Sequence, residues 1–296
     1  MLRNTFIIIL SFAICFLAGQ FVSTMIAMIT GFYNIGDIQQ LQPEMYKEIN
    51  ILKLIQFISS IFTFILPPFI IAKVIYNSPL GFLKLNTSPN VFYYCLVFIF
   101  MITVVPLMNL IIEWNNSISF PSWMKGIEEY MRDMEDSNGN ISKLILTGNS
   151  WIDLIVNLCV VALIPAIGEE LTFRGVIQSF MKRWVKNPHI AIFITAFLFS
   201  AIHFQFYGFI PRLLLGMFFG YLVYFTGSLW PAIFAHFANN GMAVISYFLM
   251  NRGVIDNEID SLGTEASDIY YLIFGIIIAG FIGKILFKKR SINNSQ

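Results

Sequence analysis

Six residues that could do chemistry stand inside or directly beside long apolar stretches of this chain. They are Glu169, Glu170, Arg174, His203, His236 and Asn240. The two glutamates follow VNLCVVALIPAIG, one histidine ends FLFSAIH, and the other lies with the asparagine in WPAIFAHFANN. A charged group at membrane depth costs about 3 kcal/mol or more. Their placement therefore predicts a functional site.

Helical spacing pairs some of these side chains and separates others. Residues four apart share a helix face, whereas adjacent residues diverge by about 100°. Glu170 and Arg174 are therefore expected to form an ion pair, while Glu169 points elsewhere. His236 and Asn240 share a face in the same way. Three helices would thus bring these groups into one interior, and an interhelical hydrogen-bond network that merely stabilises the bundle is the alternative interpretation.

The elements that must position these residues are transmembrane helices. The chain has 296 residues, of which 57% are hydrophobic and 12% charged, and its mean hydropathy is +0.73. Since a span needs about 20 apolar residues, the predicted fold class is an all-α polytopic membrane protein of about eight transmembrane helices. The greater density of Lys and Arg on one side predicts that the N- and C-termini are cytoplasmic. The expected spans are 5–33, 51–76, 91–112, 151–181, 188–207, 210–226, 229–250 and 268–287.

These spans divide the chain into four parts. Residues 1–112 hold transmembrane helices 1–3, and residues 113–150 form a long polar connection on the outer side. Residues 151–250 hold helices 4–7 with all the unusual polar residues, and residues 251–296 hold the last helix and a basic tail. The three cysteines are scattered among the spans, which gives neither a disulfide framework nor a metal-binding spacing.

The outer connection contains the pattern of an amphipathic helix. Its apolar residues recur at helical spacing, and its charged residues occupy the opposite face. The apolar set is Trp123, Ile127, Tyr130, Met131 and Met134, and the charged set is Glu128, Glu129, Arg132 and Asp133. Such a helix is expected to lie at the outer membrane interface. It either packs on the bundle or forms a lid over the site.

Several prolines and glycines have structural interpretations. Pro165 lacks a backbone donor and precedes Gly168 and the two glutamates, so a kink is expected beside the site. Gly216 and Gly220 form a small-residue face that predicts close helix packing. His189 follows Asn-Pro at the inner boundary and is interpreted as an exposed interfacial residue.

The order of the motifs resembles that of a known family. The motifs are Glu169-Glu170-x-x-x-Arg174, Phe199-x-x-x-His203 and His236-x-x-x-Asn240. Together they resemble the CPBP family, the CAAX proteases and bacteriocin-processing intramembrane endopeptidases that are also called the Abi family. The resemblance covers about residues 150–245 and includes FRG after the glutamates and TGSLWPAIFAH before the second histidine. The first 112 residues share with the family only their apolar character.

The resemblance and the chemistry of the side chains imply the same catalytic roles. A desolvated glutamate binds protons more tightly, which suits a general base at neutral pH. Glu169 is therefore the predicted base, and His203 helps to hold or activate the water. His236 and Asn240 can donate to the oxyanion of a tetrahedral intermediate. Glu170 and Arg174 are predicted to support the site by fixing the helix and the local charge.

A metal-dependent mechanism is the alternative to a glutamate mechanism. Family members are often called metalloproteases, and a zinc ion would use Glu169, His203 and His236 as ligands. The sequence has no HExxH motif, however, and these ligands would consume the residues needed as base and oxyanion donors. No cofactor is therefore the favoured prediction, with zinc as the alternative.

The predicted function is an intramembrane endopeptidase that hydrolyses a peptide bond of a membrane-associated peptide or protein. The expected partners are this substrate and the lipid bilayer, without nucleic acid, and the expected location is the plasma membrane of a prokaryote. Two other classes compete with this prediction. One is a catalytically inactive bacteriocin-immunity or scaffold protein. The other is a proton-coupled transporter, since Glu and His chains also serve pumps.

Overall fold

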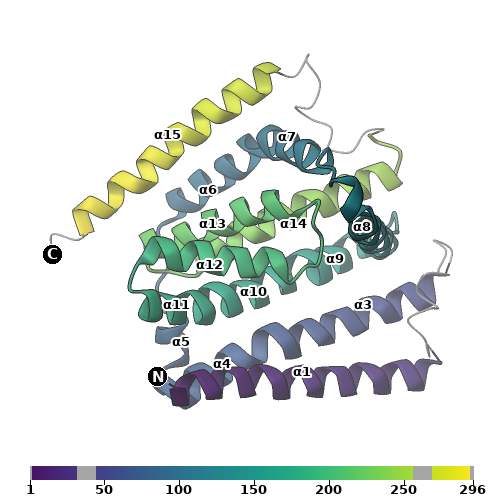
Figure 1. Ribbon diagram of the computed structural model, residues 1–296, viewed down its shortest axis with the longest axis horizontal. Helices are drawn as coiled ribbons and strands as arrows, with labels where there is room; N and C mark the ends of the chain where they lie inside the picture. The colour runs from purple at the N-terminus through teal and green to yellow at the C-terminus, as the bar shows by residue number, and fades with distance from the viewer. Residues whose placement is uncertain (1, 32–44, 256–268, 294–296) are drawn as a thin grey trace.

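The computed structural model describes residues 2–31, 45–255 and 269–293, with side chains up to residue 285. This described part is mainly helical and contains no strand. Figure 1 shows the N-terminal pair and the central helices lying roughly along one direction, with the N-terminal pair at one edge and α15 (Ile269–Asn293) running obliquely at the opposite edge. The predicted all-α membrane fold is therefore confirmed in its class.

The N-terminal helices form a closely packed pair. Helix α1 (Leu2–Thr30) lies against a long helix that runs from α3 (Tyr46–Ser60) through a π-helical segment into α4 (Leu66–Tyr76). A Cβ atom at Gly19 would stand only 2.7 Å from the Phe62 Cβ, so the glycine is what permits this approach.

The central layer is built from four long elements. The first is a continuous helix of 35 residues, Trp151–Val185, which contains α9 (Trp151–Asn157), α10 (Ile164–Glu170) and α11 (Gln178–Val185). The others are α12 (Pro188–Ala201), α13 (Phe209–Thr226) and α14 (Trp230–Asn251). Figure 1 shows these helices between the N-terminal pair and α15, and they carry all the predicted site residues except His203, which lies in the turn after α12.

The long helix accommodates Pro165 through a wide turn. The π-helical segment Leu158–Leu163 directly precedes α10, and Pro165 occupies the first turn of α10. The structure therefore has a local change of helical winding directly before Pro165, within one span. The expected kink beside the site stays a prediction.

Helices α6 (Val91–Thr103) and α7 (Val105–Asn116) replace the single predicted span 91–112. They meet at Val104 and are bent by 43° relative to one another. Pro106 lies in the first turn of α7, where its ring and missing N–H disfavour a straight continuation from α6. A cavity described below lies beside this bend.

Two further connections complete the described chain. The short helix α5 (Pro79–Phe82) links α4 to the loop before α6, and a 3₁₀ turn, Ser122–Met124, leads into α8 (Lys125–Ile145). Helix α8 is the predicted amphipathic helix. Trp123, Ile127 and Tyr130 are 80%, 52% and 65% exposed, so most of its apolar face is not used for packing on the bundle. This exposure is what a helix at a membrane interface requires.

The count of eight spans is not confirmed, although each predicted span contains a helix. The predicted span 188–207 extends past the end of its helix at Ala201, and residues 32, 33 and 268 of two other spans lie outside the described residues. Within the described residues, five helices are long and apolar enough to cross a membrane, and the bent α6–α7 pair makes a sixth. Pro188–Ala201 and Ile269–Ile285 are apolar but shorter. The molecule is a multi-pass integral membrane protein, whereas the cytoplasmic orientation of its termini stays a prediction.

Candidate active site

Glu169 and Glu170 lie in the middle of the long helix, between two π-helical segments. These segments are Leu158–Leu163 and Leu171–Ile177. Such wide turns are frequent at functional sites because they change which side chains face a neighbouring helix. The helix is fixed here against Phe64, whose carbonyl oxygen accepts a hydrogen bond of 2.9 Å from the Thr172 hydroxyl.

The predicted ion pair between Glu170 and Arg174 is present and fully buried. The Arg174 Nη1 donates to Glu170 Oε1 at 2.7 Å, and both side chains are 0% exposed. The Nη2 of the same guanidinium donates to the carbonyl oxygen of Gly216 at 2.8 Å. The guanidinium also lies over the rings of Phe199 and Phe219, with 4.5 and 5.4 Å from Cζ to the ring centroids. Arg174 thus joins the long helix to α12 and α13.

His236 lies between the two carboxylates. Its Nδ1 is 2.9 Å from Glu170 Oε1, and its Nε2 is 3.8 Å from Glu169 Oε2. Since an ionised carboxylate only accepts hydrogen bonds, the Nδ1 carries a proton when Glu170 is ionised. The ring of Phe219 stacks on the imidazole at 5.2 Å with an angle of 20°, and this contact fixes the plane of the ring.

Glu169 differs from Glu170 in its surroundings. Its side chain is 14% exposed, and the 3.8 Å gap to His236 exceeds a direct hydrogen bond. The charges that act on it are those of His236, Glu170, Arg174 and Arg212. Among the described residues no cation forms an ion pair with it other than this long contact to His236. A water molecule can therefore reach the carboxylate that sequence spacing left without a local partner.

Asn240 lies one turn beyond His236 on α14, as its spacing predicted. Its Nδ2 donates to the carbonyl oxygen of Val161 at 3.3 Å, and its Oδ1 accepts from Asn239 Nδ2 at 3.2 Å. Val161 belongs to the first π-helical segment of the long helix. Asn240 therefore connects α14 to the same helix that carries the glutamates.

His203 lies in the turn that follows α12. Its Nδ1 is 2.7 Å from the carbonyl oxygen of Phe199 and therefore donates, which leaves Nε2 as an acceptor in the neutral ring. Phe199 packs on both histidine rings, at 5.2 Å from His203 and 5.8 Å from His236. In the described structure His203 makes no direct contact with Glu169, so the structure brings it to the rim of the cluster rather than into it.

The turn that carries His203 is held by α8 and α7. The backbone N–H of Tyr207 donates to Glu135 Oε2 at 3.2 Å, and the Arg132 guanidinium lies 4.3 Å from the Tyr207 ring centroid. Asn115 donates to the Phe206 carbonyl at 3.1 Å. Burial raises the pKa of the Glu135 carboxyl above its ordinary value, and the bond from Tyr207 opposes this shift. The charged face of α8 thus contacts the site-bearing turn.

Sequence reasoning missed several parts of the arrangement. It did not foresee that Glu170 contacts His236, or that the Gly216 carbonyl accepts from Arg174. It also did not single out Arg212, although the charge of this arginine acts on both Glu169 and His203. The signal in the sequence that could have pointed to Arg212 is its position. It lies near the start of an apolar span, one helical turn before Gly216.

The alternative zinc ligands do not form a metal-sized cluster. In residues 2–31, 45–255 and 269–285, no three His, Cys, Asp or Glu side chains gather closely enough to hold a metal ion. Glu169 and His236 are neighbours, but His203 is turned toward the Phe199 carbonyl. The donor set in this arrangement therefore does not fit a three-ligand zinc site.

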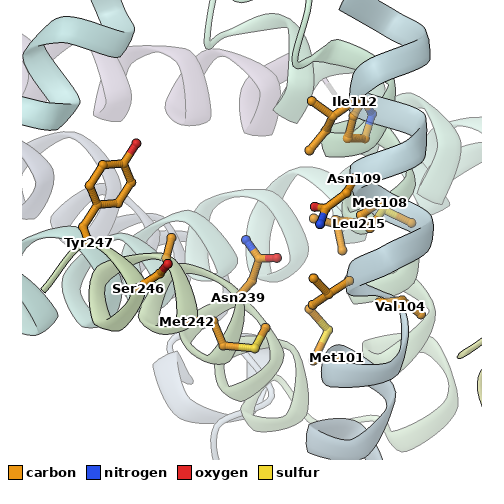
Figure 2. A pocket seen from close by; sticks show the side chains of 13 residues that line it. Met101, Val104, Met108, Asn109, Ile112, Leu215, Asn239, Met242, Ser246 and Tyr247 are labelled. Carbon is orange, nitrogen blue, oxygen red and sulfur yellow. The ribbon is translucent and has the colours of Figure 1, made fainter. Parts of the chain in front are cut away.

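A mostly apolar cavity of about 190 Å³ adjoins the site (Figure 2). It lies between the bent α6–α7 pair and helices α13 and α14, and three methionines, Met101, Met108 and Met242, contribute to its wall. Asn109 and Asn239 face one another across it in Figure 2. Because Asn239 is hydrogen-bonded to Asn240, the cavity and the candidate oxyanion donor share one segment of α14.

Comparison with known proteins gives a match over the part of the chain that carries this site. Residues 151–242 match the family model described as type II CAAX prenyl endopeptidase Rce1-like, which confirms the resemblance to the CPBP family over that segment. The match contains all six predicted site residues and leaves out the N-terminal helices and α15. No curated protein and no solved structure matches the chain significantly. The matched segment and its apolar helices point to a CAAX-type intramembrane peptidase.

Proposed function

We propose that this protein is an intramembrane endopeptidase that hydrolyses a peptide bond of a membrane-associated peptide or protein, with Glu169 activating the attacking water. The observation that carries the proposal is the placement of His236 between two carboxylates of different character. Glu170 is fully buried and bound to Arg174, whereas Glu169 is reachable by water and has no close cation. Glu170 thus has a structural role, and Glu169 is available for proton transfer.

In the proposed reaction, the water oxygen attacks the carbonyl carbon while Glu169 accepts a proton from the water. The neutral His203 presents Nε2 as an acceptor that can orient this water. Protonated His236 donates from Nε2, and Asn240 from its amide, to the developing oxyanion. Glu170 stabilises the imidazolium through Nδ1, as a carboxylate does for a catalytic histidine. Glu169 then transfers its proton to the leaving nitrogen as the carbon–nitrogen bond breaks.

The proposed substrate is apolar near the scissile bond. The cavity beside Asn240 is comparable in size to engineered apolar cavities of about 150 Å³ that bind benzene. It can therefore hold one large apolar side chain of a peptide that lies over the site. A membrane-embedded peptide provides such side chains. The proposed location is the plasma membrane of a prokaryote, with both termini on the cytoplasmic side, where the density of Lys and Arg is greater.

Replacement of Glu169 by Gln tests the assignment of the base. The amide keeps the shape of the side chain and cannot accept the proton, so cleavage should fall by about 10²-fold or more, the scale of general-base catalysis. The measurement is the release of new termini from membrane peptides by purified protein in detergent. Glu129→Gln on the exposed face of α8 is the matched control and should retain full activity.

Two results would contradict this proposal. Turnover by Glu169→Gln at the wild-type rate would remove Glu169 from the role of base. If the wild-type protein produces no new terminus from any membrane peptide, the immunity or scaffold protein and the proton-coupled transporter become the better explanations.

We further propose that the reaction needs no metal ion. Glu169 has access to water, and the three alternative ligands do not converge on one point. Treatment with a strong zinc chelator should therefore leave most of the cleavage activity, and elemental analysis should find less than one zinc per chain. Loss of activity on chelation with recovery on zinc addition would show that His203 moves to complete a metal site.

A further inference from the structure

Arg212 is a cation at the edge of the candidate site that lacks a carboxylate partner. Its Nη2 donates to the neutral amide oxygen of Gln205 at 2.8 Å, while its Nη1 is buried and has no hydrogen-bond partner. In the described part of the chain no carboxylate forms an ion pair with Arg212. Glu135 and Glu169 are the carboxylates whose charges act on it from a greater distance.

The position of Arg212 directs it toward the site. It stands four residues before Gly216, whose carbonyl binds Arg174, so both lie on the face of α13 that meets the long helix. The loop after α12 passes close to the guanidinium, since a Cβ at Gly208 would be 2.9 Å from Arg212 Nη2. The charge of Arg212 also acts on His203. The guanidinium is therefore bound to the turn that carries His203, through Gln205, and its charge acts on Glu169.

A structural role does not explain this arrangement. A buried N–H group without a partner destabilises a protein, and here the single hydrogen-bond partner of the guanidinium is neutral. Arg212 is thus unfavourable for folding unless a ligand compensates. The planar guanidinium is suited to a carboxylate, which it can bind through two nitrogens.

We propose that Arg212 binds a carboxylate of the substrate and thereby places the neighbouring peptide bond over Glu169. The carboxylate is either the free C-terminus of the peptide or the side chain of an Asp or Glu close to the cleavage point. This inference rests on the proposed peptidase function, and it adds the substrate class: apolar peptides that carry a negative charge near the scissile bond.

The experiment compares three matched mixtures of apolar decapeptides in detergent. One has a free C-terminal carboxylate, one a C-terminal amide, and one an amide together with a single internal Glu. The wild-type protein should prefer a carboxylate-bearing mixture by about ten- to a hundredfold in kcat/KM, the range of one charge-assisted hydrogen bond. The mixture that is preferred identifies the source of the carboxylate. Equal cleavage of all three mixtures would overturn the proposal.

Variants of Arg212 and Glu135 should change the preference for a carboxylate-bearing mixture in opposite directions. Arg212→Gln should raise KM for the preferred mixture by about ten- to a hundredfold with kcat nearly unchanged, and leave the uncharged amide mixture unaffected. Arg212→Lys should retain part of the preference. Glu135→Gln removes the competing negative charge and should strengthen the preference, which a purely structural arginine would not cause. Arg183→Gln, at the far end of the long helix, is the matched control and should behave as wild type.

Binding separates this proposal from the proposed peptidase function. Fluorescent forms of the same decapeptides are titrated into Glu169→Gln protein, where hydrolysis is not needed. Tighter binding of a carboxylate form, lost in the double variant with Arg212→Gln, supports the inference even if the peptidase function fails. Equal losses for the carboxylate and amide forms would overturn it, because Arg212 would then act on the site itself.

Discussion

At the scale of single residues, one oxygen atom carries much of the organisation of the site. Glu170 Oε1 accepts from both Arg174 and His236, while Glu170 Oε2 is buried without a hydrogen-bond partner. Two buried charges of opposite sign thus hold the imidazole against the long helix. A buried charge is tolerated mainly when it is paired, so each member of this set depends on the others.

Replacement of Arg174 by Ala should destabilise the protein as well as inactivate it. The change leaves Glu170 buried without a cation and removes the bond to the Gly216 carbonyl, and loss of one partner from a buried pair costs about 3–5 kcal/mol. Melting curves in one detergent should show a clear fall for Arg174→Ala. Glu169→Gln should lower activity without lowering the melting temperature. Abolished activity with unchanged melting in Arg174→Ala would instead assign this residue a direct part in the reaction.

Spacing alone predicted the intrahelical pair and the shared face of His236 and Asn240, since both follow from helical geometry. It could not predict which neighbouring helix each side chain meets. The contact of Glu170 with His236 joins residues 66 positions apart and depends on the π-helical segments that flank the glutamates. The isolation of Arg212 from carboxylates was equally invisible, because any acidic residue of the outer connection could have paired with it.

At the scale of elements, the close approach of α12 and α13 sets the positions of Phe199, Arg212 and Gly216. Hydropathy predicted these helices because apolar runs are long and uniform. It did not predict the bend between α6 and α7, since the composition stays apolar through Val104 and Pro106 can also start a straight segment. The length of α8 was also not foreseen, because Gly139 and its polar neighbours resemble a loop but extend the helix.

Gly220→Ala tests the packing of α13. The added Cβ would lie 2.8 Å from Gln178 Oε1 and 2.9 Å from Ile192 Cγ2, so these two side chains must be displaced. Overpacking of this kind costs about 1–3 kcal/mol, and the melting temperature should fall. Gly126→Ala in α8 is the control, since nothing lies within 4 Å of its added Cβ. Equal melting temperatures for the two variants would show that α13 can adjust without strain.

At the scale of the whole molecule, the helix that carries His236 and Asn240 is fixed at its start by the loop before α6. The Leu229 N–H donates to the Lys84 carbonyl at 3.0 Å, and the Ser228 hydroxyl donates to the Thr87 carbonyl at 2.6 Å. The Trp230 indole N–H donates to the Leu85 carbonyl at 3.0 Å. These bonds join the first part of the chain to the matched segment, so the N-terminal helices and the site are stabilised together.

The Lys84 side chain makes this junction dependent on pH. Burial, with a smaller effect of the Lys182 charge, lowers the pKa of Lys84 from 10.5 to about 8. The unfolded chain therefore binds more protons than the folded protein between these two values, and stability rises with pH across that window. Below pH 8 the protonated amine destabilises the folded state to its full extent, and above pH 10.5 it has no effect.

Lys84→Met should therefore raise the melting temperature at pH 7, and its advantage over wild type should shrink between pH 8 and pH 10.5 and vanish above. The thioether keeps most of the apolar stem, and the Lys84 carbonyl still accepts from Leu229, so the difference between the two proteins isolates the charge. The measurement is a pair of melting curves at each pH in one detergent, with Lys47→Met at an exposed position as the control. An advantage that stays constant from pH 7 to pH 11 would mean that methionine stabilises the junction by packing and that the charge of Lys84 does not oppose folding.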